Sequence, residues 1–196
     1  MWNKAARINM ETTHTEKMKL IDELIDKYYA DNQELNNILV LHSRDVADKA
    51  LRIIASHPQL NADPLFTEEA AMLHDIGIFL TDAPGIHCFG TEPYICHGIL
   101  GAKILNEMGW HRHARVCERH TGTGLPASEI IEQNLPLPHI DLVPETIEEQ
   151  IICFADKFFS KTKLNVEKTP EQARRSLEKF GGQTVQRFDH WCGLFL

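Results

Sequence analysis

The chain has 196 residues and a mass of 22.4 kDa, which is enough for one domain with a substantial hydrophobic core. Its formal net charge of -8 argues against a surface that binds a nucleic-acid duplex, and no apolar run reaches the roughly 20 residues of a membrane span. Five cysteines without a C-x-x-C pair support neither a disulfide framework nor a zinc finger, so we expect a cytoplasmic protein with reduced thiols.

Helical periodicity dominates the chain, and no convincing alternation of the kind found in strands is present. Apolar rows, capping residues and breakers predict helices over residues 15–29, from 31 or 32 to 57, 67–75, 95–108, 111–120, 127–133, from about 144 through 159, 170–180 and 184–192. Gly77 is expected to let the chain turn away after the third helix. Residues 80–93 are rich in Gly, Pro and Asp and are predicted to form a loop. The pattern indicates an all-α fold in a single domain over residues 1–196.

Six histidines and aspartates lie within or at the ends of these apolar segments. They are His42, His74, Asp75, His97, His120 and Asp156. An ionised Asp is almost never fully buried without a partner, so six such groups are hard to explain as core residues. Imidazole and carboxylate together are typical ligands of Zn, Mn, Fe or Ni. We therefore expect one metal centre between facing helices of a bundle.

The number of candidate ligands allows one or two ions. Four of them, namely His42, His74, Asp75 and Asp156, are enough for one ion. With His97 and His120 added there are enough for two, and the Asp75 carboxylate would bridge them. Two ions about 3.5–4 Å apart can hold a hydroxide between them and clamp a phosphoryl group for in-line attack. No serine or cysteine nucleophile is then needed, and the sequence has neither a G-x-S-x-G nor an H-E-x-x-H motif.

The order H…HD…H…H…D, continued as HDIG at residues 74–77, resembles the HD-domain superfamily of metal-dependent phosphohydrolases. Four further stretches are similar to its small HDIG-type members: LHSRDVA from Leu41, HGILGAKIL from His97, ERHTG from Glu118 and EEQIICFADK from Glu148. The resemblance covers about residues 36–163, with the C-terminal helices over 170–192 packed on that region. It implies a helical bundle of five or more helices.

By this resemblance the six residues take specific roles. His42, His74, Asp75 and Asp156 correspond to the metal ligands common to the superfamily. His97 and His120 correspond to the extra pair of its two-metal members. The ions could be Fe, Mn, Ni, Co, Zn or Mg, and their identity stays open.

Four residues are candidates for substrate binding. Lys157 and Lys161 follow Asp156 at spacings of one and five, which we interpret as one helix, and their charge would suit a phosphate. Thr121, with the amides of the glycines that follow it, could cradle the same anion. His87 lies in the 79–93 stretch, which is expected to act as a lid. For each of them a solvated surface residue is the alternative interpretation.

The leading functional hypothesis is a phosphohydrolase of small soluble phosphate esters, with nucleotides among the candidates, that works by metal-hydroxide attack with Asp75 as the catalytic bridging residue. One alternative is a di-iron oxygenase of the HD type, which uses the same kinds of ligand. Another is a non-catalytic, metal-containing domain that binds a nucleotide. The sequence does not decide the substrate, and a homodimer stays open.

Overall fold

The structure is a computed structural model that describes residues 13–196. In this part of the chain nine α-helices account for most of the fold: α1 (His14–Tyr29), α2 (Gln33–Ser56), α3 (Pro64–Leu73), α4 (His97–Glu107), α5 (His111–Arg119), α6 (Ala127–Glu132), α7 (Ile147–Asp156), α8 (Pro170–Leu177) and α9 (Gly182–Phe195). The predicted all-α class is therefore confirmed. None of the helices in the described range is long and apolar enough to cross a membrane.

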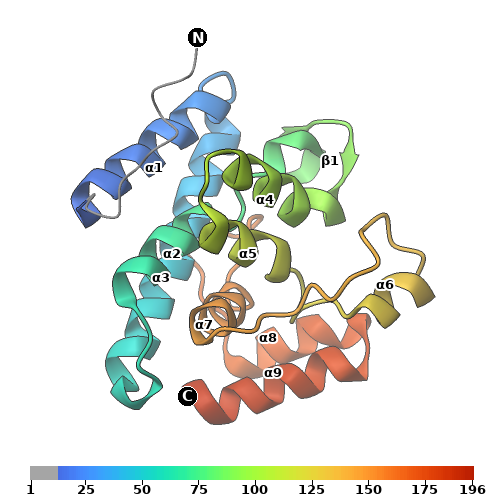
Figure 1. Cartoon of the computed structure of the whole chain (residues 1–196). Coiled ribbons are helices and arrows are strands. Elements are labelled where there is room, and N and C mark those ends of the chain that lie inside the picture. The colour runs from blue at the N-terminus through green and yellow to red at the C-terminus, as the bar shows by residue number, and fades with distance from the viewer. Residues whose placement is uncertain (1–12) are drawn as a thin grey trace.

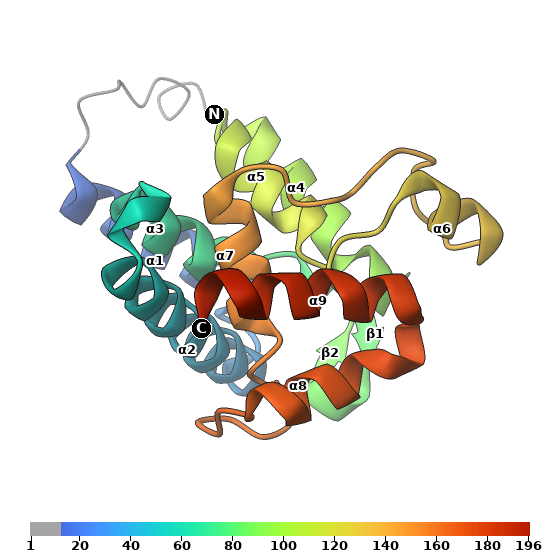
Figure 2. The same cartoon turned by 90° about the horizontal axis from the view of Figure 1, so that it is seen from below.

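The centre of the bundle is α7, which contacts α2, α3, α5 and α9. Figures 1 and 2 show α8 and α9 side by side along one face of the molecule, while α6 extends away from it. The ring of Phe154 on α7 and that of Phe158, just after the end of α7, pack against Phe188 of α9, and Trp191 and Phe195 complete the cluster. This aromatic cluster attaches the C-terminal pair of helices to the middle of the fold.

The helix boundaries follow from capping. Asn32 caps α2 by accepting a hydrogen bond from the Leu35 amide, as the sequence predicts. Helix α3 begins three residues before the predicted Thr67. Its true start is explained by Asp63, whose carboxylate accepts hydrogen bonds from the first-turn amides, and by Pro64 at the first helical position.

The segment predicted to be a loop contains a small three-stranded sheet. Strands β1 (Thr81–Ala83), β2 (Cys88–Phe89) and β3 (Glu92–Pro93) have the order β2-β1-β3. The β1–β2 pair is antiparallel and the β1–β3 pair is parallel. The prediction that this segment holds no strand is wrong, because strands of two or three residues are too short to leave an alternating pattern.

Helix α1 is fastened to the turn that follows α3. The Tyr29 hydroxyl donates a hydrogen bond of 2.7 Å to the carbonyl oxygen of Ile76, and the tyrosine side chain is buried. The same ring packs edge-on against Phe79. Since Ile76 follows Asp75 directly, this contact fixes the backbone beside a predicted metal ligand.

Gly77 is needed for close packing rather than for a turn. Its φ of -88° is open to any residue, so the expected role of Gly77 in turning the chain is not supported. A Cβ at this position would instead lie 2.3 Å from the carbonyl oxygen of His97 and 2.4 Å from the Gly101 nitrogen. Gly98 allows an equally close approach between α4 and α5, since a Cβ at this position would lie 2.4 Å from the Cys117 carbonyl oxygen. These approaches bring α4 and α5 close to the end of α3.

We expect Gly77→Ala to lower the free energy of unfolding by about 1–3 kcal/mol, because the added methyl overlaps the α4 backbone. Gly85→Ala is the matched control, since a Cβ there meets nothing within 4 Å. Both changes restrict the unfolded chain equally, so their difference in denaturant unfolding isolates the clash. Equal stability of the two variants would contradict this account of the glycine.

Candidate metal centre

The six predicted metal ligands lie together in one buried group, although they come from five different helices or helix ends. His42 lies within α2, His74 and Asp75 follow α3, His97 begins α4, His120 follows α5, and Asp156 ends α7. Their nitrogen and oxygen atoms form three groups of three, in each of which all atoms lie within 4.8 Å of one another. Five of the side chains are buried, and that of Asp156 is 12% exposed.

Asp75 occupies the middle of this group, and its two carboxylate oxygens face different histidines. Oδ2 lies 3.3 Å from Nε2 of His42 and 3.1 Å from Nε2 of His74. Oδ1 lies 3.4 Å from Nε2 of both His97 and His120. Asp156 adds its Oδ1 at 3.0 Å from Nε2 of His42 and 3.7 Å from Nε2 of His74, and it also belongs to a group of ligand atoms with His74 and His120. The carboxylate therefore has one pair of imidazoles on each side.

Three of the histidines are oriented by the backbone of their own helix turn. His74, His97 and His120 each donate from Nδ1 to a carbonyl oxygen three residues earlier, at 2.6, 2.6 and 2.7 Å. A carbonyl oxygen only accepts, so Nδ1 of each ring carries a proton, and Nε2 is the ring nitrogen that a metal ion at the centre would bind. Backbone support of this kind is usual for histidines that bind metal.

The geometry of the polar atoms fits a bound cation. The Nε2 atoms of His97 and His120 lie 3.0 Å apart, and two facing lone pairs repel unless a proton or metal ion lies between them. Both oxygens of Asp75 and the Nε2 atoms of His42 and His74 form no hydrogen bond of acceptable geometry, in spite of the short distances between them. The ligand atoms of His42, His74 and Asp75 nevertheless lie within 4.8 Å of one another, close enough to bind the same ion. The residues therefore suit divalent metal ions.

Two lysines lie directly on the carboxylates. Lys157 Nζ is 2.7 Å from Asp156 Oδ2 and also donates to the His120 carbonyl oxygen at 3.1 Å. Lys161 Nζ is 2.6 Å from Asp75 Oδ2. The interpretation that both lysines share one helix is wrong, because α7 ends at Asp156 and Lys161 lies in the turns beyond it. Those turns bring Lys161 back over the centre.

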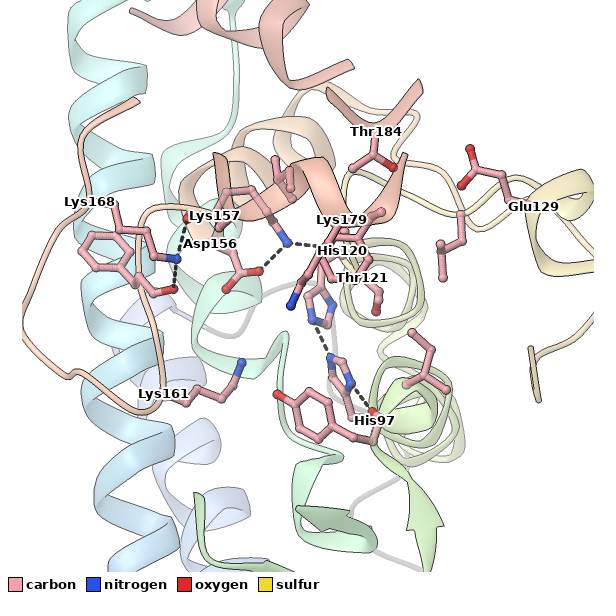
Figure 3. Close-up of a pocket in the computed structure, with 18 of the residues that line it drawn as sticks. His97, His120, Thr121, Glu129, Asp156, Lys157, Lys161, Lys168, Lys179 and Thr184 are labelled. Carbon is pink, nitrogen blue, oxygen red and sulfur yellow. Dashed lines mark hydrogen bonds and ion pairs between the residues drawn. The ribbon is translucent and has the colours of Figure 1, made fainter. Parts of the chain in front are cut away.

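A cavity of about 420 Å³ opens beside the centre. Of the predicted residues, His42, His97, His120, Thr121, Asp156, Lys157 and Lys161 line it. Figure 3 shows the His97 and His120 rings facing each other at its inner end, with Asp156 and Lys157 beside them. The sequence did not single out Tyr94, whose ring stacks on His97 at 4.8 Å, nor Lys168 and Lys179 on the outer wall. Tyr94 could have been identified in the sequence as an aromatic residue three positions before the candidate ligand His97.

His87 is not brought to this cavity. It is exposed, its backbone is left-handed with a φ of 61°, and its carbonyl oxygen accepts a hydrogen bond from Asn32. None of residues 79–93 lines the cavity, so the lid expected from this segment is not found. The small sheet occupies that stretch, and the outer wall comes from α8, the turn after it and the start of α9 instead.

Comparison with known proteins places this arrangement in a family. The model of the HD domain matches residues 39–160, which is more than half of the chain. The chain belongs to the HD-domain family. No solved structure matches it.

The chain is also similar to three proteins of known name or sequence. A tRNA (cytidine(56)-2'-O)-methyltransferase of Thermoplasma volcanium is 32% identical over 170 residues, which cover 83% of this chain and 44% of that protein. The methyltransferase of the same name from Picrophilus torridus is 34% identical over 134 residues, or 68% of this chain and 35% of the relative. An uncharacterized protein of Methanocaldococcus jannaschii is 41% identical over 93 residues. The chain thus spans less than half the length of the methyltransferases that it matches.

The charges of the HD centre are strongly coupled. Burial acts to raise the pKa of Asp75, but His74 and Lys161 outweigh it and hold that pKa well below its usual range. Burial lowers the pKa of His74, but the Asp75 and Asp156 carboxylates outweigh burial and raise it to about 9. Burial and the neighbouring His120 lower the pKa of His97 to about 3. Without metal, His74 therefore holds a proton far more strongly than His97 does.

This protonation predicts that metal binding weakens as the pH falls. Below a pH of about 9 a metal ion must displace the His74 proton, so the apparent affinity for Mn²⁺ should drop by up to about tenfold per pH unit. Titration calorimetry of the metal-free protein between roughly pH 6 and 8 measures this slope. The His139→Ala variant, which removes an exposed imidazole, should show the same slope. An affinity that does not change with pH would mean that no proton is displaced.

Proposed function

We propose that this HD-domain protein is a metal-dependent phosphohydrolase that cleaves a small phosphate ester at a centre of two divalent ions. The observation that carries the proposal is the position of Asp75, with His42 and His74 at one carboxylate oxygen and His97 and His120 at the other. A carboxylate placed in this way can bridge two ions. Ion pairs of this type clamp the attacking and leaving oxygens of a phosphoryl transfer.

The ligands divide between the two ions by their contacts. His42, His74 and Asp156 would hold the first ion with Oδ2 of Asp75, and His97 and His120 would hold the second with Oδ1. When bound, the ions supply Lewis acidity and lower the pKa of water toward neutrality. Water activated in this way would form a new bond to phosphorus as the ester P–O bond breaks, and the alcohol would leave with a proton from that water, so no side-chain nucleophile is required.

The lysines and the cavity wall supply side chains that would bind the phosphate group of the substrate. Lys157 and Lys161 would balance the negative charge that gathers on the transferring phosphoryl oxygens. Lys161 contacts Oδ2 of Asp75, and a cation held by Asp75 would repel its ammonium and leave it for the phosphate. Thr121 offers a hydroxyl on the same wall. A cationic wall of this kind favours an anionic ester over the substrate of a di-iron oxygenase.

The relatives suggest a second candidate function. Two of them are named for methylation of tRNA, yet this chain spans only 35% and 44% of their lengths. A non-catalytic, metal-containing domain that supports tRNA methylation by another protein is therefore the alternative. The net charge of -8 disfavours direct contact with tRNA, because binding to nucleic acid depends mainly on phosphate neutralisation.

Metal-reconstituted protein is expected to release phosphate from nucleotides or aryl phosphates, and Asp75→Asn should lower kcat by at least about 100-fold. The asparagine keeps the shape but removes the charge that holds both ions. His139→Ala should retain full activity, because this histidine is exposed and away from the cavity. Absence of phosphate release with Mn, Fe, Co, Ni, Zn and Mg would refute hydrolysis, and oxygen uptake by the ferrous protein would support the oxygenase.

The two-ion arrangement predicts the metal content of variants. Protein purified without chelator should contain about two ions per chain, and the double variant H97A/H120A about one, because His42, His74, Asp75 and Asp156 remain. Elemental analysis gives the count and the identity of the metal together. H139A should match the parent. Loss of all metal from the double variant, or no loss at all, would contradict the division of ligands.

A further inference from the structure

The cavity carries more positive charge than one phosphate would balance. Four lysines line it: Lys157, Lys161, Lys168 and Lys179. The first two face carboxylates of the metal centre at 2.7 and 2.6 Å. Within residues 13–196 no carboxylate lies within ion-pair distance of Lys168 or Lys179. The further carboxylate on the wall, Glu129, faces Arg187 at 3.4 Å.

Lys168 is fixed beside the other lysines by the backbone. Its Nζ donates to the carbonyl oxygens of Lys157 and Phe159 at 3.2 and 3.3 Å, which leaves the third ammonium proton for a ligand. Burial lowers the pKa of Lys168; Asp156 opposes this effect, and repulsion by the other three lysines adds to it. The four ammoniums therefore act on one another within a single cavity. Figure 3 shows Lys168 beside Lys157.

The outer wall also carries an exposed aromatic ring. Phe180 is 50% exposed and lines the cavity next to Lys179, whose Nζ lies 4.8 Å from the ring. Leu125 and Phe159 line the same space. An exposed ring beside an ammonium offers a planar ligand a stacking surface and an adjacent charge. Lys161, Lys168, Lys179 and Phe180 all lie beyond residue 160, where the HD match ends.

The charges set a requirement on the ligand. If the proposed function is correct, the positive charges of two divalent ions and four ammoniums outnumber the negative charges of the Asp75 and Asp156 carboxylates. A phosphate monoester contributes about -1.5 to -2 charges at neutral pH, which leaves a large excess of positive charge. Lys157 and Lys161 lie at the metal centre and serve the cleaved phosphoryl group, so the excess that remains lies on the side of Lys168 and Lys179. A second phosphoryl group would compensate it.

We propose that the substrate carries at least two phosphoryl groups, and that Lys168 and Lys179 bind the one that is not cleaved. Phe180 packs against an apolar or planar part of the same molecule. This assignment rests on the proposed function for the cleaved phosphoryl group. It makes the segment after residue 160 responsible for substrate choice, whereas the HD region supplies the metal centre.

Binding of small anions tests this subsite without turnover. Calorimetric titrations of phosphate and of pyrophosphate into metal-loaded protein are compared for the parent, Lys179→Met and Lys163→Met. Lys163 is the matched control, because it is exposed, lies on the same segment and does not line the cavity. Pyrophosphate should bind at least tenfold more weakly to Lys179→Met than to the parent, with little change for phosphate. Lys163→Met should behave like the parent.

Lys168→Met is the second variant. Its melting temperature is measured as well, because Lys168 also donates hydrogen bonds to the backbone just after α7 and its loss could destabilise the fold. A folded Lys168→Met protein should lose pyrophosphate affinity as Lys179→Met does. In turnover, Lys179→Met should raise KM about tenfold for nucleoside diphosphates while KM for monophosphates stays unchanged.

The outcomes separate the two proposals. If Lys179→Met and Lys168→Met bind pyrophosphate as tightly as Lys163→Met, the subsite is wrong, even when phosphate is released from esters. If no substrate is cleaved and pyrophosphate binding still depends on Lys179, the proposed hydrolysis fails and the anion subsite remains.

Discussion

The buried carboxylate of Asp75 is the group on which the rest of this structure depends. Its side chain has no exposed surface, and moving an ionised carboxylate out of water costs several kcal/mol unless cations compensate it. Four imidazole nitrogens lie 3.1 to 3.4 Å from its oxygens, and each comes from a different helix or helix end. In the folded protein His74 and Lys161, at 3.1 and 2.6 Å from Oδ2, supply the positive charge that offsets it, so the compensation depends on the segments that bring them together. A divalent ion bound by the same residues would add to this compensation and would couple metal binding to folding.

Close backbone packing makes this assembly possible. A ligand that follows or begins a helix can use its own last or first turn to hold Nδ1, as His74, His97 and His120 do. Three such turns converge only if their backbones approach closely. Gly77 and Gly98 allow this, since a side chain at either position would overlap the neighbouring backbone. The HDIG glycine thus serves the metal centre through the distance between α3 and α4.

The sequence predicted the parts of the fold and the centre that depend on local patterns. Helix ends could be found from caps such as Asn32, and the order of the six histidines and aspartates indicated one centre that the structure assembles geometrically. The short sheet could not be found, because its strands have two or three residues. The position of Lys161 depends on turns after α7, and that of Lys179 on how α8 and α9 dock through the Phe154 cluster. These are tertiary effects without a local signal.

The flanks of the HD region complete the site from both sides. Before residue 39, Tyr29 holds the carbonyl of Ile76 beside the buried carboxylate of Asp75. After residue 160, the basic and aromatic wall closes one side of the cavity. The residues of this chain that contact or flank the centre therefore extend beyond the segment that the HD domain matches. In this fold the HD segment supplies the histidines and aspartates, whereas the flanking segments supply the support behind Asp75 and much of the cavity wall, so the charge and shape of that wall depend on residues outside the match.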